Sequence, residues 1–205
     1  MHWYEEEINR LETELAGANH QPGIAFYGSS SIRLWESLEE DFKDYAPLNL
    51  GFGGSTLAAC GWFFERVFLH LQPQSIIIYA GDNDLGDGRS AEEVFLFFNE
   101  LVHLINQRYG DIPVGFISIK PSITRWEIVD KIRQSNRMIE AGIKKTGGNI
   151  SYINIYDSMT DKKGYPNHEF LEPDGLHINE KGYELWKDII LTAISEESLK
   201  IQKSA

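Results

Sequence analysis

Hydrophobic residues along the chain gather in short runs that alternate with longer segments of mixed polarity. Most of these runs begin or end at Gly, Pro or Ser, which is the pattern of strands buried inside a sheet. The predicted strands are residues 24–27, 47–50, 75–80, 113–119 and 150–155. The run Ser75–Ala80 is the clearest of them, because it is rich in β-branched residues. The last run alternates apolar and polar residues, and this alternation favours a strand at the edge of the sheet.

The segments between these runs carry apolar residues at helical spacing. Helices are predicted at residues 3–16, 37–42, 57–71, 90–109, 125–145 and 180–194. Thr56 and Asn179 are expected to cap the helices that follow them, and Ser90 with Glu93 has the spacing of a capping box. The block Val94–Phe98 is apolar nearly all round, which predicts a well-buried helix.

The alternation of strands and helices predicts an α/β fold, a three-layer α/β/α sandwich around a five-stranded parallel sheet. We expect a single domain over residues 1–205, with the first helix packed outside a core of about residues 24–195. In such a sheet, ligands bind beyond the carboxyl ends of the strands. Catalytic or binding residues are therefore expected in the turns that follow the strands.

Composition excludes several classes of function. The net charge is −12, from 19 basic and 31 acidic residues, which argues against binding to nucleic acid or to anionic membrane surfaces. The N-terminus does not resemble a signal peptide, and no apolar run approaches the length of a membrane span. Cys60 is the only cysteine, so neither an intrachain disulfide nor a cysteine metal cluster is expected. These features predict a cytoplasmic protein.

Two of the three residues that an acyl-transfer triad needs occur in the segment Asp174–His177 near the end of the chain. An Asp three residues before a His can orient the imidazole. A nucleophile is available in the Ser29–Ser31 turn after the first predicted strand. Gly54 follows the second strand and Asn83 the third, and both can donate to a developing oxyanion. Taken singly these signals are weak, because serines in a turn most often cap a helix and glycines often serve only the turn.

Together, the four segments resemble the marker blocks of the SGNH hydrolases, also called GDSL-like esterases and lipases. The blocks are Gly28–Ser30, Gly54, Gly81–Asp84 and Asp174–His177. The resemblance implies a flavodoxin-like fold and hydrolysis of esters without a cofactor or a metal.

The resemblance also implies a role for each residue of the site. It makes Ser30 the nucleophile, His177 the base and then the acid, and Asp174 the residue that orients His177. The oxyanion hole would consist of the N–H groups of Ser30 and Gly54 and the side-chain amide of Asn83. The expected partner is a small-molecule acyl or acetyl ester, and a homo-oligomer is left open without being predicted.

The chain departs from the family pattern at Ser29, where the family usually has an Asp. Two other functions stay open: an O-acetyl esterase acting on a carbohydrate or metabolite, and a non-catalytic ligand-binding domain on the same fold.

The acidic stretch Asp82–Asp87 does not have the register of a calcium loop. We expect Asp82 and Asp84 to disfavour anionic substrates. Residues 120–122 and 125–126 are expected either to wall the pocket or to form a plain loop and the start of a helix.

Overall fold

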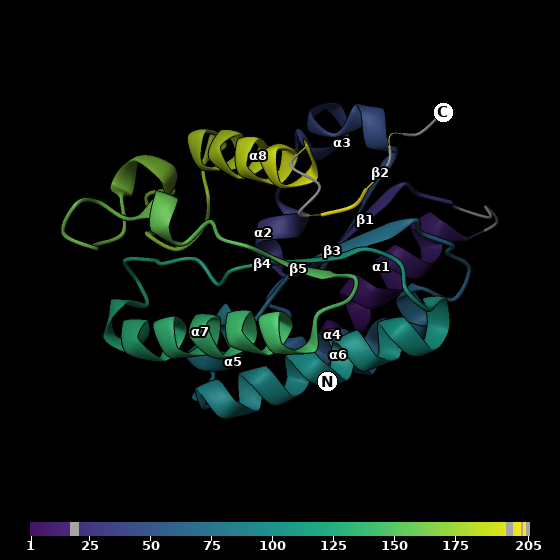
Figure 1. Ribbon diagram of the computed structural model, residues 1–205, viewed down its shortest axis with the longest axis horizontal. Helices are drawn as coiled ribbons and strands as arrows, with labels where there is room; N and C mark the ends of the chain where they lie inside the picture. Colours follow the sequence, from purple (N-terminus) through teal and green to yellow (C-terminus); the bar gives the residue numbers. More distant parts are fainter. Residues whose placement is uncertain (17–20, 196–198, 202, 204–205) are drawn as a thin grey trace.

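Five parallel strands form one sheet in the order β2-β1-β3-β4-β5 (Figure 1). The computed structural model describes residues 1–16, 21–195, 199–201 and 203. The strands are β1 (Ile24–Gly28), β2 (Pro47–Gly51), β3 (Ser75–Tyr79), β4 (Val114–Ile117) and β5 (Ile150–Ile153). The predicted parallel sheet is confirmed, and β5 lies at an edge as its alternation indicates.

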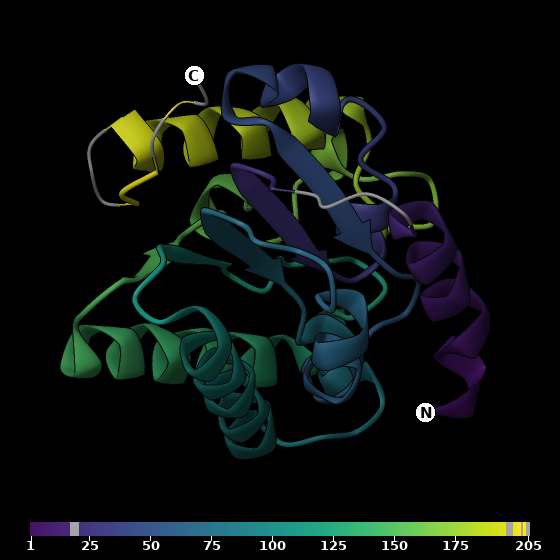
Figure 2. The same ribbon diagram turned by 90° about the vertical axis from the view of Figure 1, so that its right-hand side faces the viewer.

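Helices cover both faces of the sheet and complete the predicted three layers (Figure 2). Along the chain they are α1 (Glu5–Leu15), α2 (Ser30–Arg33), α3 (Leu38–Asp41), α4 (Leu57–Val67), α5 (Asp82–Gly86), α6 (Ala91–Tyr109), α7 (Val129–Thr146) and α8 (Glu180–Ser195). Helices α4, α6 and α7 lie on one face, and α3 and α8 lie on the other (Figure 2). Helix α1 packs against α4 and buries Ile8, Leu11 and Leu15. Within the described ranges, no helix is long and apolar enough to cross a membrane.

The period of two along each strand divides the core into two clusters. On β1, Ala25 and Tyr27 belong to the cluster shared with α1, α4, α6 and α7. Ile24 and Phe26 point the other way, into the cluster shared with α3 and α8. Because both faces are covered, the three central strands β1, β3 and β4 are buried along their whole length, and this explains why they stand out in the sequence.

Three predicted helix starts are confirmed by their caps. The Thr56 hydroxyl accepts a hydrogen bond from the Ala59 N–H at 3.0 Å, and Asn179 accepts from the Gly182 N–H at 3.0 Å. Ser90 and Glu93 form the reciprocal capping box at the start of α6. The caps fix where α4 and α8 begin relative to the loops that precede them.

Other predictions are corrected by the structure. Helix α7 begins at Val129, after a 3-10 turn, so Arg125 lies in a loop rather than in the predicted helix. The predicted burial of α6 is wrong at Leu96, whose surface is 62% exposed. This helix belongs to an outer layer, so only one of its faces is covered, however apolar the block is.

Candidate active site

The four marker blocks lie at the carboxyl edge of the sheet, on the left-hand side of Figure 1. Ser30 directly follows β1, Gly54 lies in the loop after β2, and Asn83 lies in the short helix after β3. Because β1 lies between β2 and β3, these three segments are neighbours. The order of strands reverses between β1 and β3, which is where ligands bind in this class of sheet.

The three consecutive serines differ in accessibility. Ser29 and Ser31 are 1% and 2% exposed, whereas Ser30 is partly exposed. Ser29 occupies the N-cap position of α2, yet its side chain makes no capping hydrogen bond. The structure therefore gives no support to a capping role for Ser29. Among the three, Ser30 is the hydroxyl that a substrate can reach.

Gly28 allows this turn to lie close to the neighbouring strand. Its φ of +149° is unfavourable for any other residue, and a Cβ built on it would lie 1.8 Å from the Tyr79 carbonyl oxygen. The Ser29 N–H donates to the same oxygen at 2.9 Å. Glycine at this position is thus required by the close approach of β1 and β3.

Asp174 and His177 form the pair that their spacing predicts. The distance from Asp174 Oδ2 to His177 Nδ1 is 2.6 Å, and Asp174 Oδ1 accepts from the N–H groups of Leu176 and His177 at 2.8 and 2.9 Å. The hydrogen bond from the His177 ring, followed by those two N–H groups, lowers the pKa of Asp174 to about 2. The carboxylate is therefore ionised at neutral pH and holds one ring nitrogen, leaving Nε2 for proton transfer.

Ser30 and His177 are not joined by a hydrogen bond within the described part of the chain. His177 lines a groove of about 550 Å³ that extends to Leu34, the residue that follows α2, whereas Ser30 itself does not line it. Tyr183 of α8 also lines this groove and donates to the Ser31 carbonyl oxygen at 3.0 Å. Nucleophile and base often reach hydrogen-bonding distance only when substrate is bound.

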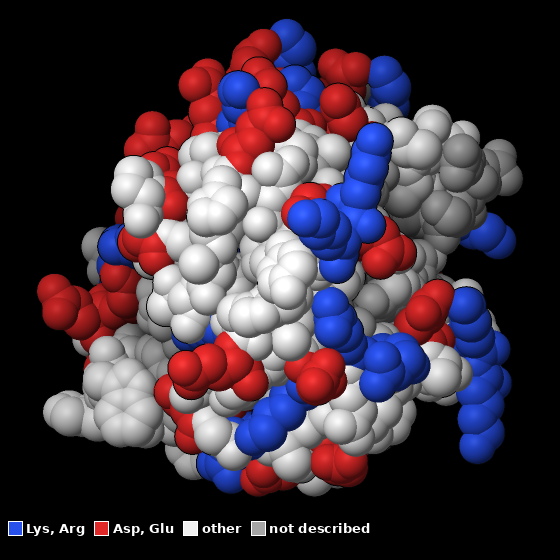
Figure 3. Space-filling view, turned by 90° about the vertical axis from the view of Figure 1, so that its left-hand side faces the viewer, with Lys and Arg blue, Asp and Glu red and all other residues white. Residues whose placement is uncertain are grey.

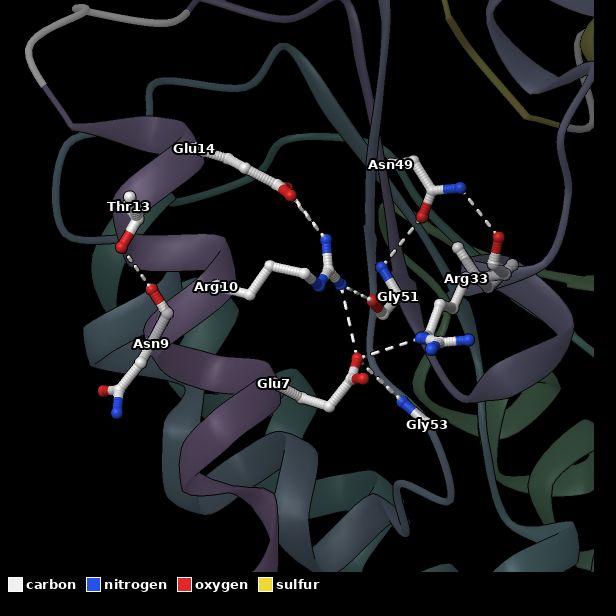
Figure 4. A network of polar contacts seen from close by, with 10 residues as sticks. Glu7, Asn9, Arg10, Thr13, Glu14, Arg33, Asn49, Gly51 and Gly53 are labelled. Carbon is white, nitrogen blue, oxygen red and sulfur yellow. Dashed lines mark hydrogen bonds and ion pairs between the residues drawn. The ribbon is translucent and has the colours of Figure 1, made fainter.

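The loop after β2 is held by the N-terminal helix (Figure 4). A Glu7 carboxylate oxygen accepts from the Gly53 N–H at 3.4 Å and from Arg33 Nε at 3.0 Å. Arg10 donates to the Gly51 carbonyl oxygen at 3.1 Å, and the Tyr4 hydroxyl donates to that of Gly54 at 3.0 Å. Glu7 takes up the Gly53 N–H, whereas Gly54 is exposed and its N–H makes no hydrogen bond to another described residue.

Asn83 is held at both ends of its amide. Its Nδ2 donates to the Ser55 carbonyl oxygen at 2.9 Å, and its Oδ1 accepts from Arg125 Nη2 at 2.8 Å. A carboxamide nitrogen carries two hydrogens. The bond to Ser55 uses one of them, and the other makes no hydrogen bond to another described residue.

The loop between β4 and α7 contacts the loop that carries Asp174, a link that the sequence does not signal. The N–H groups of Ile123 and Thr124 donate to the Gly175 carbonyl oxygen at 2.9 and 3.2 Å. The Thr124 hydroxyl donates to the Asp174 carbonyl oxygen at 2.6 Å. These backbone contacts, made across about fifty residues of sequence, fix the Asp174 loop against the sheet edge.

Asp82 and Asp84 are buried, which removes the basis for the expectation that their charges repel anionic substrates. Asp82 pairs with Lys120 and Arg125, and Asp84 accepts the Leu57 N–H at the start of α4 at 2.8 Å. Burial raises the pKa of Asp84 to about 6. Among the described residues, no three His, Cys, Asp or Glu side chains are grouped to hold a metal ion.

Negative charge near His177 comes instead from other residues. The groove beside the imidazole is lined by the carboxylates Glu36, Glu172 and Glu180. Figure 3 views this end of the molecule and shows uncharged surface over much of the middle, with acidic and basic side chains around it. The face as a whole therefore carries no field of a single sign.

Comparison with protein families agrees with the arrangement of the blocks. The profile of the GDSL-like Lipase/Acylhydrolase family matches residues 15–185. The chain belongs to this family. The family is one of lipases and acylhydrolases, so membership supports ester hydrolase activity for this chain.

Solved structures of other proteins share the fold. A GDSL-like lipase from Bacteroides thetaiotaomicron is 25% identical with a TM-score of 0.79, over 93% of this chain and 98% of its own. A carbohydrate esterase family 3 protein from Talaromyces cellulolyticus is 14% identical with a TM-score of 0.68, over 87% of this chain and 99% of its own. No curated protein matches the sequence.

Proposed function

We infer that this GDSL-like protein is a serine ester hydrolase that forms an acyl-enzyme at Ser30. The observation that carries the proposal is the 2.6 Å pair of Asp174 and His177, located at the sheet edge where Ser30 is accessible. Such a pair supplies an oriented base, and the neighbouring turn supplies a hydroxyl. A binding module would need neither.

The proposed reaction uses only this chain's residues, an ester and water. His177 Nε2 takes the Ser30 proton while Oγ attacks the ester carbonyl carbon, and Asp174 stabilises the imidazolium. The oxyanion accepts hydrogen bonds from the N–H groups of Ser30 and Gly54 and from Asn83 Nδ2. His177 then protonates the departing alcohol. A water molecule, deprotonated by His177, attacks the acyl-enzyme, and the acid leaves as Ser30 regains its proton.

We propose small acyl or acetyl esters without a negative charge as the substrates. Glu36, Glu172 and Glu180 line the groove next to His177 and would repel a carboxylate on either portion of the ester. The same oxygens accept hydrogen bonds from hydroxyl groups, which makes O-acetylated carbohydrates the second candidate class. A pair of esters that differ only by a carboxylate tests the charge preference, and equal kcat/KM values would remove it.

A substrate panel tests the proposed function. Nitrophenyl esters of increasing acyl length and acetylated sugars are assayed with wild type, Ser30→Ala and Ser29→Ala. We expect Ser30→Ala to lower kcat by a factor on the order of 10⁴ or more. Ser29→Ala is the matched control, because the Ser29 hydroxyl is buried without a hydrogen-bond partner in the described chain, and we expect it to stay active. Hydrolysis that survives in Ser30→Ala would contradict the proposal.

A further inference from the structure

Arg125 is the one cationic side chain that donates a hydrogen bond to Asn83 in the described part of the chain. It lies in the loop between β4 and α7, and its Nη2 donates to Asn83 Oδ1 at 2.8 Å across 42 residues of sequence. The sequence alone assigns this residue to a helix or a pocket wall. Its observed contact places it behind the proposed oxyanion donor instead.

This contact selects one orientation of the Asn83 amide. Rotation of the amide by half a turn would exchange its oxygen and nitrogen. The Arg125 guanidinium can only donate, so it requires the oxygen on its side, and the Ser55 carbonyl requires the nitrogen on the other. The rotated amide would place two donors together and two acceptors together. Arg125 and the Ser55 carbonyl oxygen therefore determine together which end of the Asn83 amide faces the site.

The charge of Arg125 also acts on the strength of the donor. A hydrogen bond from a cation to an amide oxygen draws electron density from the amide and polarises its N–H groups. The effect grows in a site with little water, and only 17% of the Arg125 side-chain surface is exposed. The remaining N–H of Asn83 would bind a developing oxyanion more strongly than that of an unpolarised amide.

The guanidinium is itself held in place. Arg125 Nη1 lies 3.3 Å from Asp82 Oδ2, and Lys120 Nζ lies 3.4 Å from the same oxygen. Gly86 leaves the space that the guanidinium fills, since a Cβ there would lie 2.9 Å from Arg125 Cζ. The two residues before Arg125 are bonded to the Asp174 loop, so its backbone is fixed relative to His177.

The contacts of the buried cluster formed by Asp82, Lys120 and Arg125 favour a role in function over a role in stability. Asp82 Oδ1 and Arg125 Nη1 are buried without a hydrogen-bond partner among the described residues. Removing three ionisable groups from water is seldom recovered by ion pairs whose geometry is this incomplete. A buried charge cluster that touches a proposed oxyanion donor is therefore expected to serve that donor.

We propose that Arg125 is a positioning residue for ester hydrolysis: it orients and polarises the Asn83 amide toward the oxyanion. The inference rests on the proposed function. It predicts that Arg125 acts on the rate only through Asn83, so the effects of removing the two residues should not multiply.

A double-mutant cycle tests this dependence. Steady-state hydrolysis of nitrophenyl acetate is measured for wild type, Asn83→Ala, Arg125→Ala and the double variant. We expect Asn83→Ala to lower kcat by about 100-fold or more and Arg125→Ala by about tenfold, with KM changed less than kcat. The double variant should be within about twofold of Asn83→Ala, because an absent amide cannot be misplaced.

Arg108→Ala is the matched control. Arg108 is 22% exposed and donates to the carbonyl oxygens of Phe68 and Leu69. Arg108→Ala therefore also removes a partly buried arginine that makes hydrogen bonds, but at a place away from Asn83. We expect its kcat to match that of the wild type. Gly86→Ala keeps the Arg125 charge and displaces the guanidinium, and it decides the question if Arg125→Ala does not fold. We expect Gly86→Ala to lower kcat severalfold.

The outcomes separate this inference from the proposed function. An active wild type whose kcat is unchanged in Arg125→Ala or Gly86→Ala overturns the role of Arg125 alone. Single-variant losses that multiply in the double variant also overturn it. A wild type without any ester hydrolysis overturns the proposed function and the role of Arg125 with it.

Discussion

Two sets of charged side chains support the proposed oxyanion hole, one beside the Gly53–Gly54 loop and one beside Asn83. They differ in their exposure to water. On the Gly53–Gly54 side, Glu7 is 25% exposed, and its partners Arg10 and Arg33 are each 39% exposed. On the Asn83 side, Asp82, Lys120 and Arg125 are 7%, 2% and 17% exposed. The same ion-pair chemistry therefore operates with water on one side and almost without it on the other.

This difference determines how strongly each group acts. Solvent-facing charges are screened by water and salt, so a network of that kind contributes little and can adjust. Although partial burial opposes it, the Gly53 N–H and the Arg33 charge lower the pKa of Glu7. Buried charges interact strongly and leave a large penalty when one is removed. The buried side should be rigid and costly to disturb, and the exposed side tolerant.

Removal of the buried carboxylate should give the largest effect. Asp82→Ala leaves Lys120 and Arg125 side by side without their shared anion. We expect a loss of about 3–5 kcal/mol in the free energy of unfolding, seen as a fall in Tm on the order of 10 °C. Thermal unfolding followed by circular dichroism measures this shift.

Asp130→Ala is the control for that variant. Asp130 also pairs with an arginine, at 3.5 Å, but its side chain is 95% exposed. We expect its Tm to stay within about 1 °C of the wild type, as for most exposed ion pairs. Equal shifts for the two variants would contradict the distinction between buried and exposed pairs.

Asp84 is a buried carboxylate that forms no ion pair with a described residue, so the pH dependence of stability tests the effect of burial on its own. Burial raises the pKa of Asp84 from 3.8 to about 6, so the folded protein prefers the neutral form. Its stabilising contribution is full below about pH 4 and is lost as pH rises through 6. We expect wild type to lose about 2–3 kcal/mol relative to Asp84→Asn between pH 4 and 7.5.

Urea unfolding of both proteins across this pH range measures the difference. Asp87→Asn is the control, because Asp87 is exposed near Asp84, and it should follow the wild type. Parallel stability curves for wild type and Asp84→Asn would show that Asp84 titrates at its ordinary value.

The exposed group should give the smallest effect. Glu7→Gln removes the charge that holds Gly53 and Arg33, and we expect kcat to fall by about two- to fivefold with less than about 1 kcal/mol lost in stability. High salt should bring wild type toward Glu7→Gln by screening the same charge. Glu14→Gln is the control, since Glu14 pairs with Arg10 and does not contact Gly53. A wild-type rate that is insensitive to salt would contradict this account of Glu7.

The fold is predictable because its signals are local. Strands buried on both faces are short apolar runs, and Thr56 and Ser90 mark helix starts within a few residues of the groups they cap. The candidate site is predictable for a related reason. Parallel strands bring their carboxyl ends to one edge, so the positions of Ser30 and Asn83 directly after predicted strands are enough to place both residues at that edge.

The bracing residues cannot be predicted in this way. Glu7 reaches Gly53 across 46 residues and Arg125 reaches Asn83 across 42, and neither pair has a spacing or composition that marks it. The predicted start of α7 is wrong for the same reason. Residues 125–128 have an ordinary helical pattern, and tertiary contacts of Arg125 with Asp82 and Asn83 hold that residue outside the helix.

Covalent labelling with a fluorophosphonate, with the modified residue located by mass spectrometry, tests the proposed nucleophile most directly. The reagent reacts with a serine that an adjacent base activates. The account predicts one label on Ser30 in the wild type and none in Ser30→Ala. A label on Ser29 or Ser31, or no label on the folded wild type, would contradict it.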